Sequence, residues 1–293
     1  MDQATQLRKM MQTDAKPQAR VITVTSGKGG VGKTSISLNL AIQLTRMGKK
    51  VVVFDADFGL ANIEVMLGVR PQYNLADMMF HGKELADILT QGEEGICFIS
   101  GGSGIQELAS MNREQVLYLT SRLVELDQFA DVIIVDTGAG ISDSVLEFVL
   151  SSTEVLLVAT PEPTSITDAY ALLKALNRKA EFSKEETSIK MISNRVRSEA
   201  EGQNLYEKMR VVSDKFLSIP IEYIGAVPMD EQITKAVMRQ KPVSVINPEA
   251  PAAKAIKKIA GKILELDSET KERWGISQLF SNLIRNKMLK KNM

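Results

Sequence analysis

The feature that most constrains this chain is a glycine-rich stretch, SGKGGVGKTS at residues 26–35, set between two regular patterns. The apolar run VITVT precedes it and is typical of a buried strand, whereas SISLNLAIQLTRMG follows with helical periodicity. Residues 27–34 satisfy G-x-x-x-x-G-K-[S/T], a pattern whose glycines let backbone N–H groups surround a phosphate chain at the positive end of the next helix. The flanking strand and helix make a chance glycine-rich turn the weaker alternative.

Seven short apolar runs alternate with helical patterns along the chain, which predicts an α/β fold. These runs are continuously apolar rather than alternating, as in a parallel sheet covered on both faces. They occupy residues 21–25, 50–57, 95–100, 131–137, 154–160, 189–193 and 221–227. No linker interrupts the pattern before about residue 265, so we expect a single doubly wound, mostly parallel domain at 21–267. Residues 1–20 and 268–293 are then a tether and a C-terminal amphipathic segment.

Composition limits the classes of function. Lys plus Arg and Asp plus Glu both number 36, so no overall field attracts the protein to DNA or to a membrane. The single cysteine, Cys97, excludes an internal disulfide and a cysteine-based metal site within one chain, and His81 is the only histidine. No apolar run reaches the roughly 18 residues of a membrane span, and the N-terminus lacks a signal-peptide core. We therefore expect a cytoplasmic protein.

The glycine-rich stretch defines a candidate ATP site. Lys33 is expected to contact the β- and γ-phosphates, and the Thr34 hydroxyl to bind Mg²⁺. The whole predicted loop comprises Gly27, Lys28, Gly29, Gly30, Val31, Gly32, Lys33, Thr34 and Ser35.

Three aspartates at strand ends complete the predicted chemistry. Asp136 ends the run DVIIVD, as the acid that holds magnesium does in other phosphate-loop enzymes. Asp55 and Asp57 are two positions apart, hence on one side of an extended segment. We expect Asp55 to share the magnesium shell and Asp57 to orient the attacking water. A strand-end aspartate can also cap a helix, but three of them beside a phosphate loop favour catalysis.

A phosphate loop needs one lysine, yet Lys28 directly follows the first glycine. Its side chain should point away from the phosphates of its own subunit. It is either solvated or crosses to a second subunit, where it would neutralise transition-state charge as an arginine finger does.

The stretches KGGVGKTS, DADFGLAN and VIIVDTGAGI together resemble the deviant Walker-A ATPases of the MinD/ParA family, over residues 21–265. The resemblance implies a homodimer that sandwiches two ATP molecules with Mg²⁺, with Lys28 crossing the interface and Asp57 as the hydrolytic residue. It also implies slow, regulatory turnover. By the same resemblance, Asn194, Arg195 and Pro228 border the adenine. Gly138 departs from the pattern, because many members have proline or alanine there.

The N-terminal string DQATQLR closely resembles the activator motif of the flagellar-placement ATPases of the FlhG type, also called FleN or YlxH. PEPTSITDAYALLKAL in the core is similar to that branch as well. The resemblance implies that Gln3, Leu7 and Arg8 bind and stimulate FlhF, a GTPase of the signal-recognition-particle type, and that flagellar switch or C-ring proteins are further partners. On composition alone, an unstructured leader is the alternative.

The C-terminal stretch WGISQLFSNLIRNKMLKK repeats apolar residues at three- and four-residue spacing and ends in cations. This pattern predicts a helix that lies in a membrane surface, although packing on the core is the alternative. Both hold if the helix is docked in the monomer and released on dimerisation. The protein would then be cytoplasmic as a monomer and peripheral on the inner face of the cytoplasmic membrane as an ATP dimer. The predicted membrane-contacting residues are Trp274, Ile276, Leu279, Phe280, Leu283, Ile284, Arg285 and Lys287.

Two rival functions share the ATPase core. A MinD-type division-site ATPase would have the same tail but would not explain DQATQLR. A ParA-type DNA-partitioning ATPase is opposed by the zero net charge and the apolar tail, so DNA is an unexpected partner. An iron–sulfur carrier needs a cysteine pair that this chain lacks.

Overall fold

The structure is a computed structural model that describes residues 18–57, 62–101, 118, 121–123, 125–267, 275–276, 279–280 and 282–283. Several predicted functional residues lie outside these ranges: Gln3, Leu7, Arg8, Trp274, Ile284, Arg285 and Lys287.

Within the described residues the strands form one eight-stranded sheet, in the order β3-β4-β2-β5-β1-β6-β7-β8. All seven predicted strands are present, and every pairing is parallel except β3 with β4, so the predicted fold class is confirmed. The short edge strand β3 was not predicted, because two residues carry no periodicity. The strands are β1 (Arg20–Ser26), β2 (Val51–Ala56), β3 (Thr90–Gln91), β4 (Cys97–Ile99), β5 (Val132–Ala139), β6 (Glu154–Ala159), β7 (Ser188–Val196) and β8 (Ile221–Pro228).

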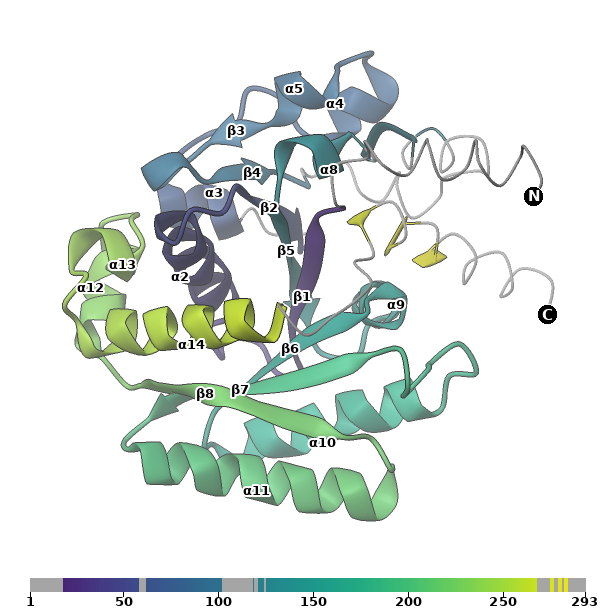
Figure 1. Cartoon of the computed structure of the whole chain (residues 1–293), viewed down its shortest axis with the longest axis vertical. Coiled ribbons are helices and arrows are strands. Elements are labelled where there is room, and N and C mark those ends of the chain that lie inside the picture. Colours follow the sequence, from purple (N-terminus) through teal and green to yellow (C-terminus); the bar gives the residue numbers. More distant parts are fainter. Residues whose placement is uncertain are drawn as a thin grey trace, which may run out of the picture.

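The strands are apolar throughout because both faces of the sheet are covered. In β2, Val51 and Val53 pack in one hydrophobic cluster, while Val52 and Phe54 pack in another on the opposite face. The first face is covered by α2 (Lys33–Arg46) and α14 (Pro251–Asp267), which lie side by side (Figure 1). The opposite face is covered by α4 (Leu75–Phe80), α5 (Leu85–Ile88), α8 (Leu126–Phe129), α9 (Asp143–Ser151), α10 (Pro163–Asn177) and α11 (Glu199–Phe216).

The remaining described elements join or flank these layers. They are α3 (Asn62–Leu67), the 3-10 turn η1 (Glu93–Gly95), α12 (Glu231–Met238) and α13 (Val243–Ile246).

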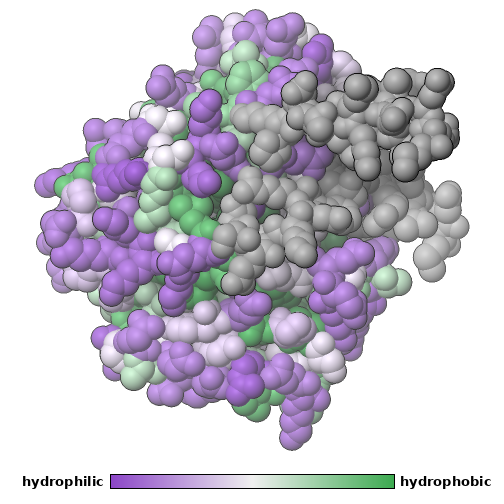
Figure 2. All heavy atoms as spheres, viewed as in Figure 1, coloured by the Kyte–Doolittle hydropathy of each residue, from purple (hydrophilic) through white to green (hydrophobic). Residues whose placement is uncertain are grey.

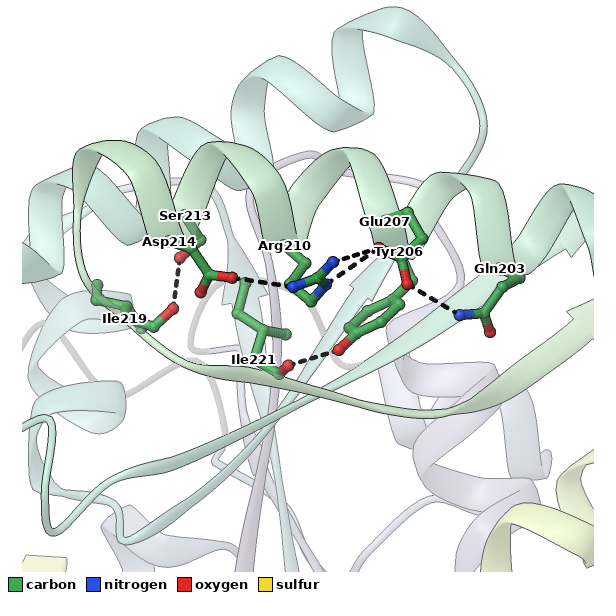
Figure 3. Close-up of polar contacts among 8 residues, drawn as sticks. All are labelled: Gln203, Tyr206, Glu207, Arg210, Ser213, Asp214, Ile219 and Ile221. Carbon is green, nitrogen blue, oxygen red and sulfur yellow. Dashed lines mark hydrogen bonds and ion pairs between the residues drawn. The ribbon is translucent and has the colours of Figure 1, made fainter.

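Helix α11 illustrates how the edge of the molecule is fixed (Figure 3). The Tyr206 hydroxyl donates to the carbonyl of Ile221 at 2.9 Å, and the Ser213 hydroxyl donates to that of Ile219 at 2.8 Å. On the exposed side, Arg210 pairs with Glu207 and Asp214 along the helix, so its charge is neutralised locally.

The coloured surface seen in Figure 2 is largely hydrophilic, with smaller hydrophobic areas. Within the described part of the chain, no helix combines the length and apolar character that crossing a membrane requires.

Candidate nucleotide site

The glycine-rich loop follows the carboxyl end of β1. Strands β2 to β5 lie on one side of β1 in the sheet and β6 to β8 lie on the other, so the direction of strand addition changes here. Ligands usually bind at such a change of direction in open α/β sheets. Gly30 and Gly32 have φ values of +75° and +98°, which favour glycine. Gly27 is needed for packing, since a Cβ there would lie 2.1 Å from the backbone of Asp168 in α10. The loop shape thus depends on glycine at three of its positions.

Asn194, near the end of β7, supports this loop from two strands away in the sheet, since β6 lies between β1 and β7. Its side-chain amide donates to the Val31 carbonyl at 2.7 Å, and a Cβ at Gly32 would lie 2.7 Å from the same amide nitrogen. Arg195 is exposed with φ of +57°, and Pro228 ends the adjacent strand β8. The structure therefore assigns Asn194 a scaffolding contact, while contact of these three residues with adenine stays a prediction.

Lys33 opens α2 and is buried, with 7% of its surface exposed. Burial lowers the pKa of its ammonium, and the charges of Asp136 and Asp57 act in the opposite direction. A phosphate chain beside this ammonium would add negative charge where burial alone disfavours the cation. The position of Lys33 therefore fits the predicted nucleotide.

Asp136 in β5 is fully buried and incompletely paired. Ser37 donates to its Oδ1 at 2.8 Å, whereas its Oδ2 has no hydrogen-bond partner among the described residues. Burial raises the pKa of Asp136 to about 6, although the nearby Thr34, the hydrogen bond from Ser37 and the Lys33 charge act in the opposite direction. An unpartnered buried carboxylate oxygen beside the Thr34 hydroxyl is the donor set that magnesium binds.

Asp55 lies directly across from Asp136 in the β2–β5 pairing. Burial, followed by the Asp136 charge, raises the pKa of Asp55 to about 8. A divalent cation would relieve both effects, so the residues present fit Mg²⁺. Among the described residues no group of three His, Cys, Asp or Glu could hold a metal by itself.

Asp57 follows β2 directly, and both its backbone and its side chain are held. Its N–H donates to Asp55 Oδ1 at 3.1 Å, and the Asn62 amide donates to its Oδ2 at 2.9 Å. The charge of Asp57 acts on Lys33 and Asp136, so the predicted residues meet at this end of the sheet. Asn62 and Ser37 were not predicted, although Asn62 closes the quoted stretch DADFGLAN.

Lys28 has a partner within its own chain. Its ammonium donates to Glu162 Oε2 at 2.6 Å and to the Thr164 hydroxyl at 2.8 Å, at the start of α10. The side chains of Lys28 and Glu162 are 33% and 55% exposed, so the pair is accessible to a second molecule. The Glu162 contact was not predicted, and the crossing of Lys28 to a second subunit stays a prediction.

Comparison with known proteins agrees with this geometry. A family model described as ParA, NUBPL iron-transfer P-loop NTPase, matches residues 18–264. The antiactivator FleN of Pseudomonas aeruginosa is 42% identical over 254 residues, which cover 87% of this chain and 89% of FleN. The flagellum site-determining protein YlxH of Helicobacter pylori is 35% identical, covering 93% of this chain and 92% of YlxH.

The same holds for solved structures. The septum site-determining protein MinD of Pyrococcus horikoshii, complexed with Mg-ADP, superposes with a TM-score of 0.66 at 26% identity, covering 86% of this chain and 99% of MinD. The chain belongs to the MinD/ParA family of P-loop ATPases. These comparisons confirm the family resemblance that was drawn from KGGVGKTS, DADFGLAN and VIIVDTGAGI. The activity of this ATPase is ATP hydrolysis.

The C-terminal segment of this ATPase is docked on the core where it is described. Ile276, Leu279, Phe280 and Leu283 are all buried in the cluster that contains Phe54. The Phe280 ring packs edge-on against Phe54, at 5.8 Å between centroids, and against Phe148 of α9 at 6.3 Å. Core packing, one of the two alternatives for this segment, is therefore what these residues do in the single chain.

Both appendages of this ATPase meet at Asp127 in α8. Its Oδ1 accepts hydrogen bonds from the backbone N–H groups of Ala19 and Ile276, each at 3.3 Å. Gly275 donates in turn to the Gln18 side chain at 3.0 Å. Asp127 Oδ1 thus accepts from both ends of the chain: from Ala19, near the end of the N-terminal tether, and from Ile276 of the docked C-terminal segment.

Proposed function

We propose that this chain is an ATP-dependent, dimerising, membrane-associating switch that regulates flagellar number and placement. The observation that carries the proposal is the seat of the C-terminal segment. Four of the residues that its pattern marks as membrane-contacting, Ile276, Leu279, Phe280 and Leu283, instead pack in the hydrophobic cluster that contains Phe54 and Phe148. Similarity to FleN and YlxH supports the flagellar role.

The hydrolytic roles follow from the arrangement at the phosphate loop. Lys33 would neutralise the phosphate chain, and Thr34, Asp55 and Asp136 would hold a magnesium ion, which would shield the phosphate charge. Asp57 orients water for attack on the γ-phosphorus, so its replacement by alanine should leave ATP binding intact and stop hydrolysis. A second subunit is expected to receive Lys28, which must first leave Glu162. That exchange is inexpensive because exposed ion pairs contribute little.

The path from nucleotide to membrane runs through two phenylalanines. Phe54 immediately precedes Asp55, and Phe148 lies on α9, the helix that follows β5 and its Asp136. Both rings contact Phe280 of the docked segment. Rearrangement of these strand ends around ATP would therefore loosen the seat. A dimer with two released helices gains membrane affinity by avidity, because one such helix binds weakly.

The N-terminal residues are proposed to act on a different partner. Gln3, Leu7 and Arg8 would stimulate FlhF, while flagellar switch or C-ring proteins would bind the body of the ATPase. Release of the C-terminal segment removes Ile276 from Asp127, which also holds Ala19. Membrane binding and exposure of the activator motif would then be coupled.

Co-sedimentation with anionic liposomes tests the proposal. The protein is incubated with ATP or ADP, with Asp57→Ala used to preserve the ATP state. We expect binding in ATP, little binding in ADP, and none after deletion of 268–293. Asp127→Ala, which removes the shared acceptor, should raise binding in ADP. Asp127→Asn is the matched control, because it keeps the accepting oxygen and should bind as the wild type does.

The same experiment separates the rivals. Binding to duplex DNA at equal salt, with no liposome binding, would replace the proposal by a partitioning function. Liposome binding without stimulation of an SRP-type GTPase would favour a MinD-type function. Deletion of residues 1–11 should abolish that stimulation and leave ATP hydrolysis unchanged.

A further inference from the structure

The two carboxylate oxygens of Asp57 lie in different surroundings. Oδ2 accepts the hydrogen bond from the Asn62 side-chain amide at 2.9 Å. Oδ1 lies over Gly138 of β5, only 3.2 Å from the position that a Cβ on Gly138 would occupy. One oxygen is therefore fixed by a donor, and the other occupies space that exists because residue 138 has no side chain.

The space over Gly138 is bounded on a second side. A Cβ there would also lie 3.5 Å from Val145 Cγ2 and 3.7 Å from Asp57 Cγ. Gly138 has none of the positive φ values found at Gly30, Gly32 and Gly140. Its backbone thus accepts alanine, and what glycine contributes at this position is room for the Asp57 carboxylate.

The Asp57 carboxylate lies among the charged residues of the proposed nucleotide site. Its charge acts on the ammonium of Lys33 and on the carboxyl groups of Asp55 and Asp136. The Asp57 backbone is fixed as well, through its N–H to Asp55 Oδ1. The direction of the side chain therefore depends on Asn62 from one segment and on Gly138 from another.

We infer that Asn62 and Gly138 are positioning residues for ATP hydrolysis, which together set the direction of the Asp57 carboxylate. The inference rests on the proposed role of Asp57 as the residue that orients water. Hydrolysis is sensitive to such direction because a displacement of about 1 Å can reduce a rate about 100-fold. Neither residue belongs to the phosphate loop, so nucleotide affinity should not depend on them.

Steady-state ATP hydrolysis by the full-length protein tests this, at protein concentrations where the specific activity no longer rises. Asn62→Leu keeps the approximate shape and removes the donor. We expect kcat to fall about 10-fold, as for loss of a hydrogen bond to a charged group, with the KM for ATP within about twofold of wild type. Asn62→Gln retains an amide and should recover part of the rate.

Gly138→Ala tests the second half of the inference. The methyl group displaces Oδ1 by a few tenths of an ångström, and kcat should fall about 3-fold to 10-fold at unchanged KM. Since both changes act on one carboxylate, the double variant should lose less than the product of the two single losses. Asn204→Ala and Gly261→Ala are matched controls: Asn204 is exposed on α11, and a Cβ at Gly261 meets nothing within 4 Å.

Asp57→Ala, measured alongside, separates two kinds of failure. If Asp57→Ala hydrolyses ATP normally, the proposed role of Asp57 fails and the inference fails with it. If Asp57→Ala is inactive while Asn62→Leu and Gly138→Ala keep the wild-type kcat, the inference alone is overturned. A raised KM at unchanged kcat would likewise overturn it, because that result assigns the two residues to nucleotide binding.

Discussion

Each end of the parallel sheet buries carboxylates, but the two ends treat them differently. At the amino ends of the strands, the Glu154 carboxylate of β6 accepts two hydrogen bonds from the Arg20 guanidinium, at 2.7 and 2.8 Å, and one from the Lys190 ammonium, at 2.8 Å. Arg20 also donates to the Ile263 carbonyl of α14. Burial raises the pKa of Glu154, but the hydrogen bonds and charges of Arg20 and Lys190 outweigh it, so the net pKa is lowered.

At the carboxyl ends, Asp55 and Asp136 are as buried as Glu154, yet their pKa values are raised. Asp136 keeps one oxygen without a partner among the described residues. Burial alone therefore does not distinguish a structural carboxylate from a functional one. What distinguishes them is whether the protein's own cations outweigh the effect of burial on the pKa: Arg20 and Lys190 do so at Glu154, whereas Lys33 does not at Asp136.

The largest effect on stability is expected at the amino ends of the strands, where the Glu154 carboxylate is paired with two cations. Glu154→Gln removes the carboxylate that both Arg20 and Lys190 contact, and the side chains of these two cations are only 8% exposed. Loss of one partner from a buried pair costs about 3–5 kcal/mol of unfolding free energy, measurable by urea denaturation. Glu222→Gln, at an exposed position on β8, is the control and should change stability by less than about 0.5 kcal/mol. Equal stability of the two variants would remove the distinction between the ends.

For Asp136→Asn we expect the opposite of Glu154→Gln: stability is retained and ATP hydrolysis is lost. The amide keeps an acceptor for Ser37 and removes a charge that burial disfavours, so the urea midpoint should stay or rise. Hydrolysis of Mg-ATP should fall about 100-fold or more, equivalent to about 2.7 kcal/mol, because the proposed magnesium ligand is lost. A variant that is both unstable and active would show that Asp136 is a structural residue like Glu154.

The sequence predicted the sheet and the strand-end acids because both depend on local pattern. Continuous apolar runs identify buried parallel strands, and Asp55 and Asp136 directly end two of them. The partners of these groups are not local. Ser37 lies 99 residues from Asp136, and Glu162 lies 134 residues from Lys28. Only the order of the strands in the sheet brings them together, and local sequence pattern does not reveal that order.

A third test uses pH without magnesium or nucleotide. A carboxyl group whose pKa is higher in the folded protein stabilises the fold while it is protonated. Its contribution is complete below the unfolded pKa, near 4, and is lost as pH rises through the folded pKa. For Asp55 that value is about 8, so between pH 6 and 7 unfolding free energy should fall, by at most about 1.4 kcal/mol.

Asp55→Asn is the matched variant for this test, because it cannot ionise. Urea denaturation at pH 6 and pH 7 should show a smaller pH dependence for Asp55→Asn than for the wild type. If the unfolding free energies of the two proteins change equally between pH 6 and pH 7, Asp55 ionises in the folded protein as it does in the unfolded chain. The carboxyl ends of the strands would then need no cation to hold Asp55 ionised.

The smallest effect is expected where charges pair at the surface. On α11, Arg210 lies between Glu207 and Asp214 (Figure 3). All three side chains are 43–49% exposed. Water screens such pairs, so Arg210→Ala should leave the urea midpoint unchanged within error, although it breaks as many ion pairs as Glu154→Gln does. A loss comparable to that of Glu154→Gln would show that the number of ion pairs governs stability. An unchanged midpoint would assign the difference to burial, and would leave the incomplete pairing at Asp55 and Asp136 as the feature specific to the nucleotide end.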